Sequence, residues 1–212
     1  MFATLEPAHK LSKQDFASAE LSLRQQLLTM QFELATKPYP VIIIVAGVSG
    51  AGRGAVLHRL NEWMDPRGIE TYAFWDSSDE EEQRPYWRFW RAMPRHGQIG
   101  VFFSSWYTQP IVARACADID QTRFDAELQR ITEFERMLSK SGALVVKLWF
   151  HLSADVASKR LRQDRQSRAG QLHIPGQGHS RGELYRKFAQ ASERAIRHTD
   201  TRHSPWHLID AS

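Results

Sequence analysis

A glycine-rich turn at residues 47–54 is the part of the chain whose residue types and spacing point to chemistry. Gly47, Gly52 and residue 53 follow the G-x-x-x-x-G-K pattern of a phosphate-binding loop. Glycines let backbone N–H groups close around phosphate oxygens, and a following helix offers the positive end of its dipole. The same glycines would also suit a tight strand-to-helix turn that serves packing alone. The pattern favours a phosphate-binding loop whose binding residues are Gly47, Gly50, Gly52, Arg53 and Gly54.

Two residues of this loop depart from the usual pattern. Arg53 stands in place of a lysine, and Gly54 stands in place of a serine or threonine. A planar guanidinium keeps the positive charge but reaches a phosphate differently from a compact ammonium. Gly54 offers no hydroxyl to Mg²⁺, so a metal ion would need carboxylates from elsewhere in the chain. We therefore expect a loop that can still hold phosphate but is less suited to in-line transfer.

The loop lies between elements that the hydrophobic pattern predicts. Apolar runs predict strands at 41–46, 69–75, 98–103, 143–152 and 206–211. Helical spacing predicts helices at about 12–36, 53–64, 84–93, 120–140, 154–168 and 183–198, and residues 169–182 are expected to form a loop. Strands that alternate with helices predict an α/β fold with a mostly parallel sheet, as a single domain over residues 1–212.

The first predicted helix has an amphipathic pattern. Its apolar residues recur at helical spacing and are Phe16, Leu23, Leu27, Met30 and Leu34. The Lys-Pro-Tyr-Pro segment at 37–40 ends this pattern. This segment is therefore predicted to be an amphipathic helix.

Composition limits the class of protein. Of 212 residues 42% are hydrophobic, which is enough for a sizeable core, and a single cysteine, Cys116, excludes an internal disulfide. No signal peptide and no bilayer-length apolar run are present, so we expect a cytoplasmic protein with neither a membrane nor a nucleic acid as partner. Residues 159–202 hold 11 Lys and Arg against 4 Asp and Glu. This local excess suits either a bound polyanion or a solvated helix face.

Several ordered motifs resemble the polyphosphate kinase 2 family. They are GVSGAGRG (47–54), LNEWMDPRGIE (60–70), RPYWRFWRAMP (84–94), IGVFFSSWYTQ (99–109) and TDTRHSPWHLID (199–210). The likeness is to the N-terminal half of two-domain polyphosphate:AMP phosphotransferases. It implies a three-layer αβα P-loop kinase fold with a helical lid, here at about 154–198. It also implies phosphoryl transfer between inorganic polyphosphate and a nucleotide such as AMP, with Mg²⁺ as the cofactor of active members.

The departures from that family pattern concern its charged residues. Active members carry G-x-D-G-A-G-K-G in the loop, where this chain has Ser49 and Arg53. After the third strand they carry F-D-R-S-W-Y-N-R, so Phe103 replaces an aspartate, and Ser104 and Gln109 replace arginines. Phosphoryl transfer depends on positioning and charge neutralisation. We therefore expect no metal site in this chain, and we assign no catalytic residue to it.

The arginines and aromatic residues outside the loop allow two interpretations. Arg84 and Arg88, in a tryptophan-rich segment, and Arg160 are candidate nucleotide or polyphosphate contacts, or else solvated charges. Trp87 and Trp90 are expected in the core. Trp106 and Tyr107 are expected to pack under the site, because they remain where the neighbouring acids are gone.

Three functions follow from these alternatives. The first is a catalytically degenerate N-terminal copy with a structural or phosphate-binding role, whose partner is a C-terminal catalytic copy or a second identical chain. The second is an active polyphosphate-dependent kinase whose metal site is rebuilt from Asp76, Asp79 or Glu80. The third is a polyphosphate-binding module without chemistry that uses Arg53, Arg84, Arg88 and the basic C-terminal segment.

Overall fold

The computed structural model describes Phe2 and residues 12–74, 78–153, 155–157, 159–160 and 181–211. The predicted loop at 169–182 lies almost wholly outside these residues, and so does most of the helix predicted at 154–168. The helical lid therefore stays a prediction. Asp76 and the side chain of Asp79, two of the alternative metal ligands, are also outside the described part.

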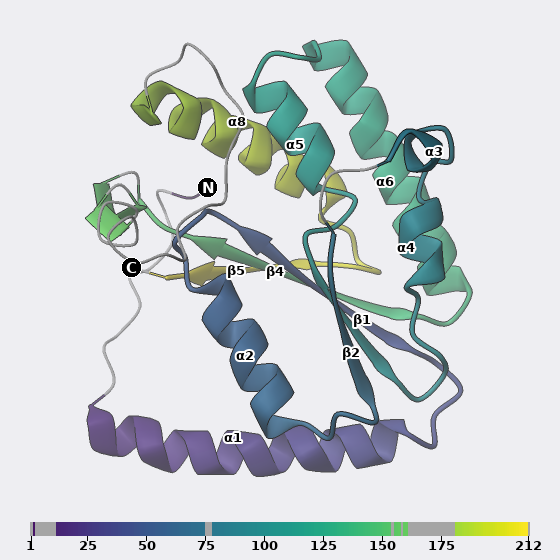
Figure 1. Ribbon diagram of the computed structural model, residues 1–212, viewed down its shortest axis with the longest axis vertical. Coiled ribbons are helices and arrows are strands. Elements are labelled where there is room, and N and C mark those ends of the chain that lie inside the picture. The colour runs from purple at the N-terminus through teal and green to yellow at the C-terminus, as the bar shows by residue number, and fades with distance from the viewer. Residues whose placement is uncertain are drawn as a thin grey trace.

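A five-stranded sheet forms the centre of the fold (Figure 1). Its strands are β1 (Val41–Gly47), β2 (Ile69–Ala73), β3 (Ile99–Phe103), β4 (Leu144–His151) and β5 (Trp206–Asp210). Their order is β2-β3-β1-β4-β5, and every strand pairs in parallel with its neighbour. The predicted α/β fold with a parallel sheet is confirmed.

Helices cover both faces of the sheet (Figure 1). The helices are α1 (Lys13–Leu34), α2 (Arg53–Trp63), α3 (Asp79–Glu82), α4 (Trp87–Arg91), α5 (Thr108–Ala115), α6 (Gln121–Lys140) and α8 (Arg181–Thr199). The first two lie on one face, and α4, α5, α6 and α8 lie on the other. The predicted helix at 84–93 is shorter, because Tyr86 has a left-handed backbone (φ 63°) just before α4 begins. The sequence reading missed α5.

Two apolar clusters, one on each face, hold the layers together. Ile42, Ile44 and Ala46 of β1 belong to the cluster under α5, α6 and α8, whereas Val41 and Val45 belong to the cluster on the α1 and α2 side. This alternation follows from the two-residue period of a strand. Because β1 is buried on both faces, its sequence is a continuous apolar run, which is why the sequence predicts it well.

Helix α1 is present as predicted, but its apolar stripe is largely open. Ser12 caps the helix by accepting a hydrogen bond from the Asp15 backbone N–H (3.1 Å). Leu34 is buried, yet Phe16, Leu23 and Met30 are 47%, 49% and 45% exposed. The buried residues of α1, Gln31 and Leu34, both lie at its C-terminal end.

The described helices include none that is long and apolar enough to cross a membrane.

Candidate phosphate-binding site

The candidate loop follows the carboxyl end of β1 and is fixed to β4. The Val48 backbone N–H donates to the Phe150 carbonyl oxygen (2.9 Å). Gly47 has φ of 132°, and a Cβ added there would lie 2.1 Å from the same oxygen. Only glycine fits this position, because both the backbone angle and the close approach exclude a side chain.

The turn from the loop into α2 uses two further glycines. Gly50 and Gly52 have φ of 80° and 76°, and Gly52 is the N-cap of α2 with no capping side chain. The first N–H groups of a helix have no partner within it, and the helix dipole makes this end positive. Here those N–H groups, starting with Arg53, face the end of the loop. The geometry is that of an anion-binding turn.

Gly54 differs from the other glycines of the loop. It lies in the first turn of α2 without a positive φ, and a Cβ added there would meet nothing within 4 Å. A larger residue would therefore fit. The backbone at Gly54 does not require a glycine. The missing hydroxyl is therefore a difference in chemistry from the usual loop.

Arg53 and Phe103, two of the positions that depart from the family pattern, contact each other. The Arg53 Cζ lies 5.1 Å from the centre of the Phe103 ring, which is a cation–π arrangement. Phe103 ends β3, where it is in register with Val45 of β1, so its ring lies beside the loop. Both side chains are half-buried. Burial lowers the pKa of Arg53, because desolvation disfavours the charged guanidinium.

Arg160 is also brought to the loop, although it is far away in sequence. Its Nη1 donates to the Gly50 carbonyl oxygen (3.2 Å). This contact steadies the turn and places a second guanidinium beside it. Ser49 is half-buried in the same turn.

Arg84 and Arg88 lie on the segment around α4, at the end of β2. The Cζ of Arg88 is 5.3 Å from the centre of the Phe74 ring, and its Nη1 lies 3.8 Å from the Glu81 carboxylate. Arg84 is exposed and lies 3.5 Å from Glu80. Only Arg88 is therefore half-buried against aromatic rings near the strand ends.

The tryptophans of this segment were predicted wrongly. The buried residue of α4 is Phe89, whereas Trp90 is 45% exposed and Trp87 is half-buried with the Arg91 guanidinium over its ring (4.8 Å). The left-handed Tyr86 rotates the short helix so that Phe89 faces the sheet.

The segment after β3 has uncharged side chains at Ser104 and Gln109 and two buried aromatic residues. Ser104 has an unusual left-handed backbone (φ 73°), and Gln109 is exposed in the first turn of α5. Trp106 and Tyr107 are buried, as predicted for residues that pack under the site.

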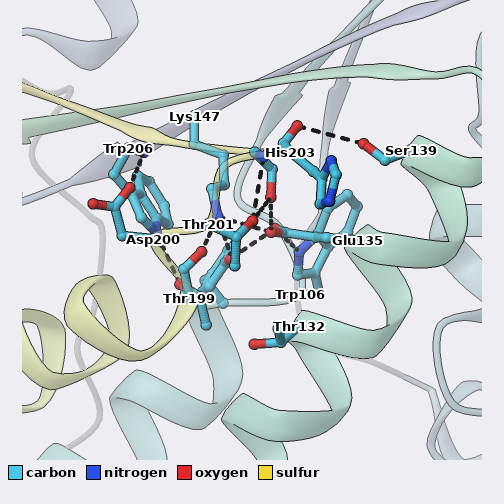
Figure 2. A network of polar contacts seen from close by, with 12 residues as sticks. Trp106, Thr132, Glu135, Ser139, Lys147, Thr199, Asp200, Thr201, His203 and Trp206 are labelled. Carbon is cyan, nitrogen blue, oxygen red and sulfur yellow. Dashed lines mark hydrogen bonds and ion pairs between the residues drawn. The ribbon is translucent and has the colours of Figure 1, made fainter.

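A buried polar network explains the position of these two aromatic residues (Figure 2). The Glu135 carboxylate of α6 accepts hydrogen bonds from Trp106 Nε1 (3.0 Å), Tyr107 Oη (2.6 Å) and Ser204 Oγ (2.8 Å). Its ion pair with Lys147 Nζ of β4 measures 2.7 Å. The network joins α5, α6, β4 and the turn before β5.

The Lys147 ammonium has its other hydrogen bonds within the same network. Its Nζ donates to Tyr107 Oη (3.0 Å) and to the Thr199 carbonyl oxygen (2.8 Å) at the end of α8. Burial lowers the pKa of Lys147, although the Glu135 carboxylate opposes this shift. Burial and Glu135 together raise the pKa of Tyr107 well above its ordinary value.

The sequence reading missed this network, although both charges carry a signal. Lys147 interrupts an apolar strand, and Glu135 falls on the buried stripe of α6 with Leu128, Ile131 and Leu138. A charged residue at an apolar position of two neighbouring elements indicates a buried pair.

The fold agrees with the comparison to known proteins. The family model for Polyphosphate kinase 2 (PPK2) matches residues 10–212. The chain belongs to the polyphosphate kinase 2 family.

Two relatives from pseudomonads share more than a third of their aligned residues with this chain. It is 38% identical to the polyphosphate:AMP phosphotransferase of Pseudomonas aeruginosa over 214 residues, and 34% identical to that of Pseudomonas syringae pv. tomato over 212 residues. The matches cover 100% and 99% of this chain but 43% of each relative. The chain thus spans less than half the length of these curated relatives.

Solved structures of the family share the fold. A crystal structure of a polyphosphate kinase 2 from Pseudomonas aeruginosa PA01 superposes with a TM-score of 0.85 at 38% identity, covering 100% of this chain and 43% of that one. The Arthrobacter aurescens TC1 polyphosphate kinase 2 gives the same TM-score at 24% identity, covering 99% of this chain and 77% of that one.

Those residues around the loop that the structure describes do not fit the magnesium ion that the family implies. Mg²⁺ prefers carboxylate and hydroxyl oxygens in an octahedral arrangement. At the corresponding positions stand the Phe103 ring, the uncharged Ser49 and Gly54, which has no side-chain oxygen. Within the described ranges, no group of three or more His, Cys, Asp or Glu side chains could hold a metal ion.

Proposed function

We propose that this chain is a catalytically degenerate copy of the polyphosphate:AMP phosphotransferase type, with a structural and phosphate-binding role. The observation that carries the proposal is the contact between Arg53 and Phe103 at 5.1 Å. A phenyl ring and a half-buried guanidinium stand where the active pattern has metal-binding and phosphate-binding charges. Transfer of a phosphoryl group needs that charge to be neutralised in the transition state.

The glycine turn supports retained phosphate binding. Gly47 is held against Phe150 and cannot change without strain, and the N-terminal end of α2 has no side-chain cap. A loop that has kept its backbone conformation keeps its N–H donors. The chemistry of inorganic polyphosphate, a chain of phosphates, matches these donors.

The alternative of a rebuilt metal site finds less support. Glu80 lies 3.5 Å from Arg84, and Glu81 pairs with Arg88 and accepts from the Ser78 N–H. These carboxylates are engaged by neighbouring arginines and a helix start, as expected for solvated acids at a helix N-terminus.

A partner surface is part of the proposal. Phe16, Leu23 and Met30 recur every seven residues along α1 and are about half exposed. Such a stripe on a long helix suits burial against another copy of this fold, in the same longer chain or in an oligomer. Since the relatives are more than twice as long, a second copy in one chain is the simpler arrangement.

The test is phosphoryl transfer by the purified chain. The chain is incubated with polyphosphate, Mg²⁺ and AMP or ADP, and nucleotide products are separated by ion-exchange chromatography. The proposal predicts no enzyme-dependent product. Turnover by the native chain would overturn it and would direct attention to the acidic segment 76–82.

A further inference from the structure

Among the described residues, aromatic rings and guanidinium groups lie at the carboxyl ends of β3, the neighbour of β1, and of β2, the strand beyond β3. Phe103 ends β3, and Phe74 directly follows β2; the Phe74 N–H donates to the Phe103 carbonyl oxygen (3.3 Å). Arg53 lies over the first ring and Arg88 over the second, at 5.1 and 5.3 Å. The same edge in a metal-dependent site would present acids to the cation.

The two arginines are not equivalent. Arg88 has a carboxylate nearby, since Glu81 lies 3.8 Å from its Nη1. Within the described part of the chain, the Arg53 guanidinium has no hydrogen bond or ion pair, and its cation–π contact is the Phe103 ring. This half-buried cation has lost water to burial, and no described carboxylate pairs with it. An anionic ligand would therefore gain from meeting it.

The Phe103 ring also limits where the Arg53 guanidinium can lie. A cation over a ring face keeps its donors free at its edges, because the contact uses no N–H group. The guanidinium follows Gly52 at the first residue of α2, beside the backbone N–H groups of the turn. The N–H groups of the guanidinium and those of the turn can thus donate hydrogen bonds to the oxygens of the same phosphate chain.

We propose that this loop binds an oligophosphate chain without a divalent cation, with the guanidinium of Arg53 held over Phe103 in the role that the metal ion has elsewhere. This inference rests on the proposed function and adds to it the independence from metal. Arg53 neutralises the phosphate charge directly. Phe103 holds the Arg53 guanidinium in position. Its ring also occupies the position at which an aspartate could bind a hydrated metal ion.

Calorimetric titration of the purified chain with inorganic tripolyphosphate tests the inference. The titration is run in EDTA and again in excess MgCl₂. We expect binding in EDTA, with an affinity at least equal to that in MgCl₂, because Mg²⁺ would compete with Arg53 for the phosphate charge. Binding that needs Mg²⁺, or no binding in either buffer, overturns the inference.

Matched variants locate the site. Arg53→Ala should weaken binding in EDTA by about tenfold or more, since a charge-assisted contact is lost. Arg59→Ala is the control, because Arg59 lies on the same helix over a ring, Trp63, at 5.9 Å but pairs with Glu20 and Glu62. Equal losses in the two variants would reduce the effect to general charge and contradict the inference.

Phe103 is tested by two changes. Phe103→Leu keeps the apolar volume without the ring and should weaken binding about two- to fivefold. Phe103→Asp places an anion beside Arg53 and should abolish binding in EDTA while making it depend on Mg²⁺. Thermal unfolding of each variant shows that it is folded. Unchanged binding by folded Phe103→Asp would contradict the assigned role.

The outcome separates this inference from the proposed function. Mg²⁺-dependent binding without turnover removes the inference and leaves the degenerate copy intact. Turnover by the native chain removes the proposed function, whatever the titration shows.

Discussion

Lys147 and Arg53 are two cations in the same domain, and their surroundings differ in kind. Lys147 is fully buried, and its ammonium meets Glu135, Tyr107 and a backbone carbonyl at 2.7 to 3.0 Å. Arg53 is half-buried and meets a phenyl ring. The charge of Lys147 is satisfied within the fold, so its role is to hold elements together. The charge of Arg53 is assigned, by the inference above, to a phosphate ligand.

The comparison teaches that this chain has the scaffold of its family, and the proposed function adds that the reacting edge has changed. Trp106 and Tyr107 both donate hydrogen bonds to the buried Glu135 carboxylate. Phe103 and Ser104, which precede Ser105 and Trp106, are not part of this hydrogen-bond network. A buried network restricts substitution because each unpaired member costs free energy, whereas a solvent-facing edge does not.

Breaking the Lys147 network should give the largest effect. Glu135→Gln keeps the shape but leaves a buried ammonium without its counter-charge, which should cost about 3–5 kcal/mol of unfolding free energy. Urea unfolding followed by tryptophan fluorescence measures this loss. The control is Glu127→Gln, because Glu127 pairs with Arg130 at the surface (2.9 Å) and should cost less than about 1 kcal/mol. Similar losses in the two variants would refute the structural role of the network.

The sequence predicted the sheet and the loop because both have local signals. Strand β1 is a continuous apolar run, and the glycines of residues 47–54 mark a turn whose backbone excludes side chains. The contact between Arg53 and Phe103 has no local signal, since 50 residues separate them and strand order decides their approach. Helix α4 was misjudged because the left-handed backbone at Tyr86, which turns Phe89 inward, has no counterpart in the helical pattern.

The loop backbone can be tested with a matched pair of glycines. Gly47→Ala places a Cβ 2.1 Å from the Phe150 oxygen and should destabilise the fold by about 2 kcal/mol or more. Gly54→Ala meets open space within a helix and should be neutral or stabilise by up to about 1 kcal/mol. Thermal unfolding of both variants makes the comparison. A neutral Gly47→Ala would mean that the loop is not fixed to β4.

The pairing of Arg53 with Phe103 should be measurable without any ligand. A double-mutant cycle with Arg53→Met and Phe103→Leu should give a coupling of about 0.5–1 kcal/mol in unfolding free energy. This coupling is far below the loss of unfolding free energy expected for the network around Lys147. The difference is expected because Lys147 is paired within the fold and Arg53 contacts a ring. A coupling of zero would show that the two side chains are independent.

The ion pair between α6 and α8 should give the smallest effect and a defined pH dependence. Arg194 binds Asp125 through two hydrogen bonds (2.6 and 2.7 Å) and lowers the pKa of that carboxyl. Its contribution, about 1 kcal/mol or less because both groups are partly exposed, is present above the unfolded pKa. It is lost as pH falls through the lowered folded pKa.

Unfolding of the native chain and of Asp125→Asn across acidic pH checks this sign. The stability difference between them should be largest near neutral pH and should shrink below about pH 4. A difference that stays constant with pH would contradict the assignment to the carboxylate.

The most direct test of the account is to restore the charged residues of the active family pattern beside the loop. A variant combining Ser49→Asp, Arg53→Lys and Phe103→Asp is assayed for Mg²⁺-dependent phosphoryl transfer from polyphosphate to AMP or ADP, beside the native chain. The account predicts turnover by the variant and none by the native chain. A variant that unfolds cooperatively and still binds tripolyphosphate with Mg²⁺, yet gives no turnover, would contradict the claim that the scaffold has stayed competent.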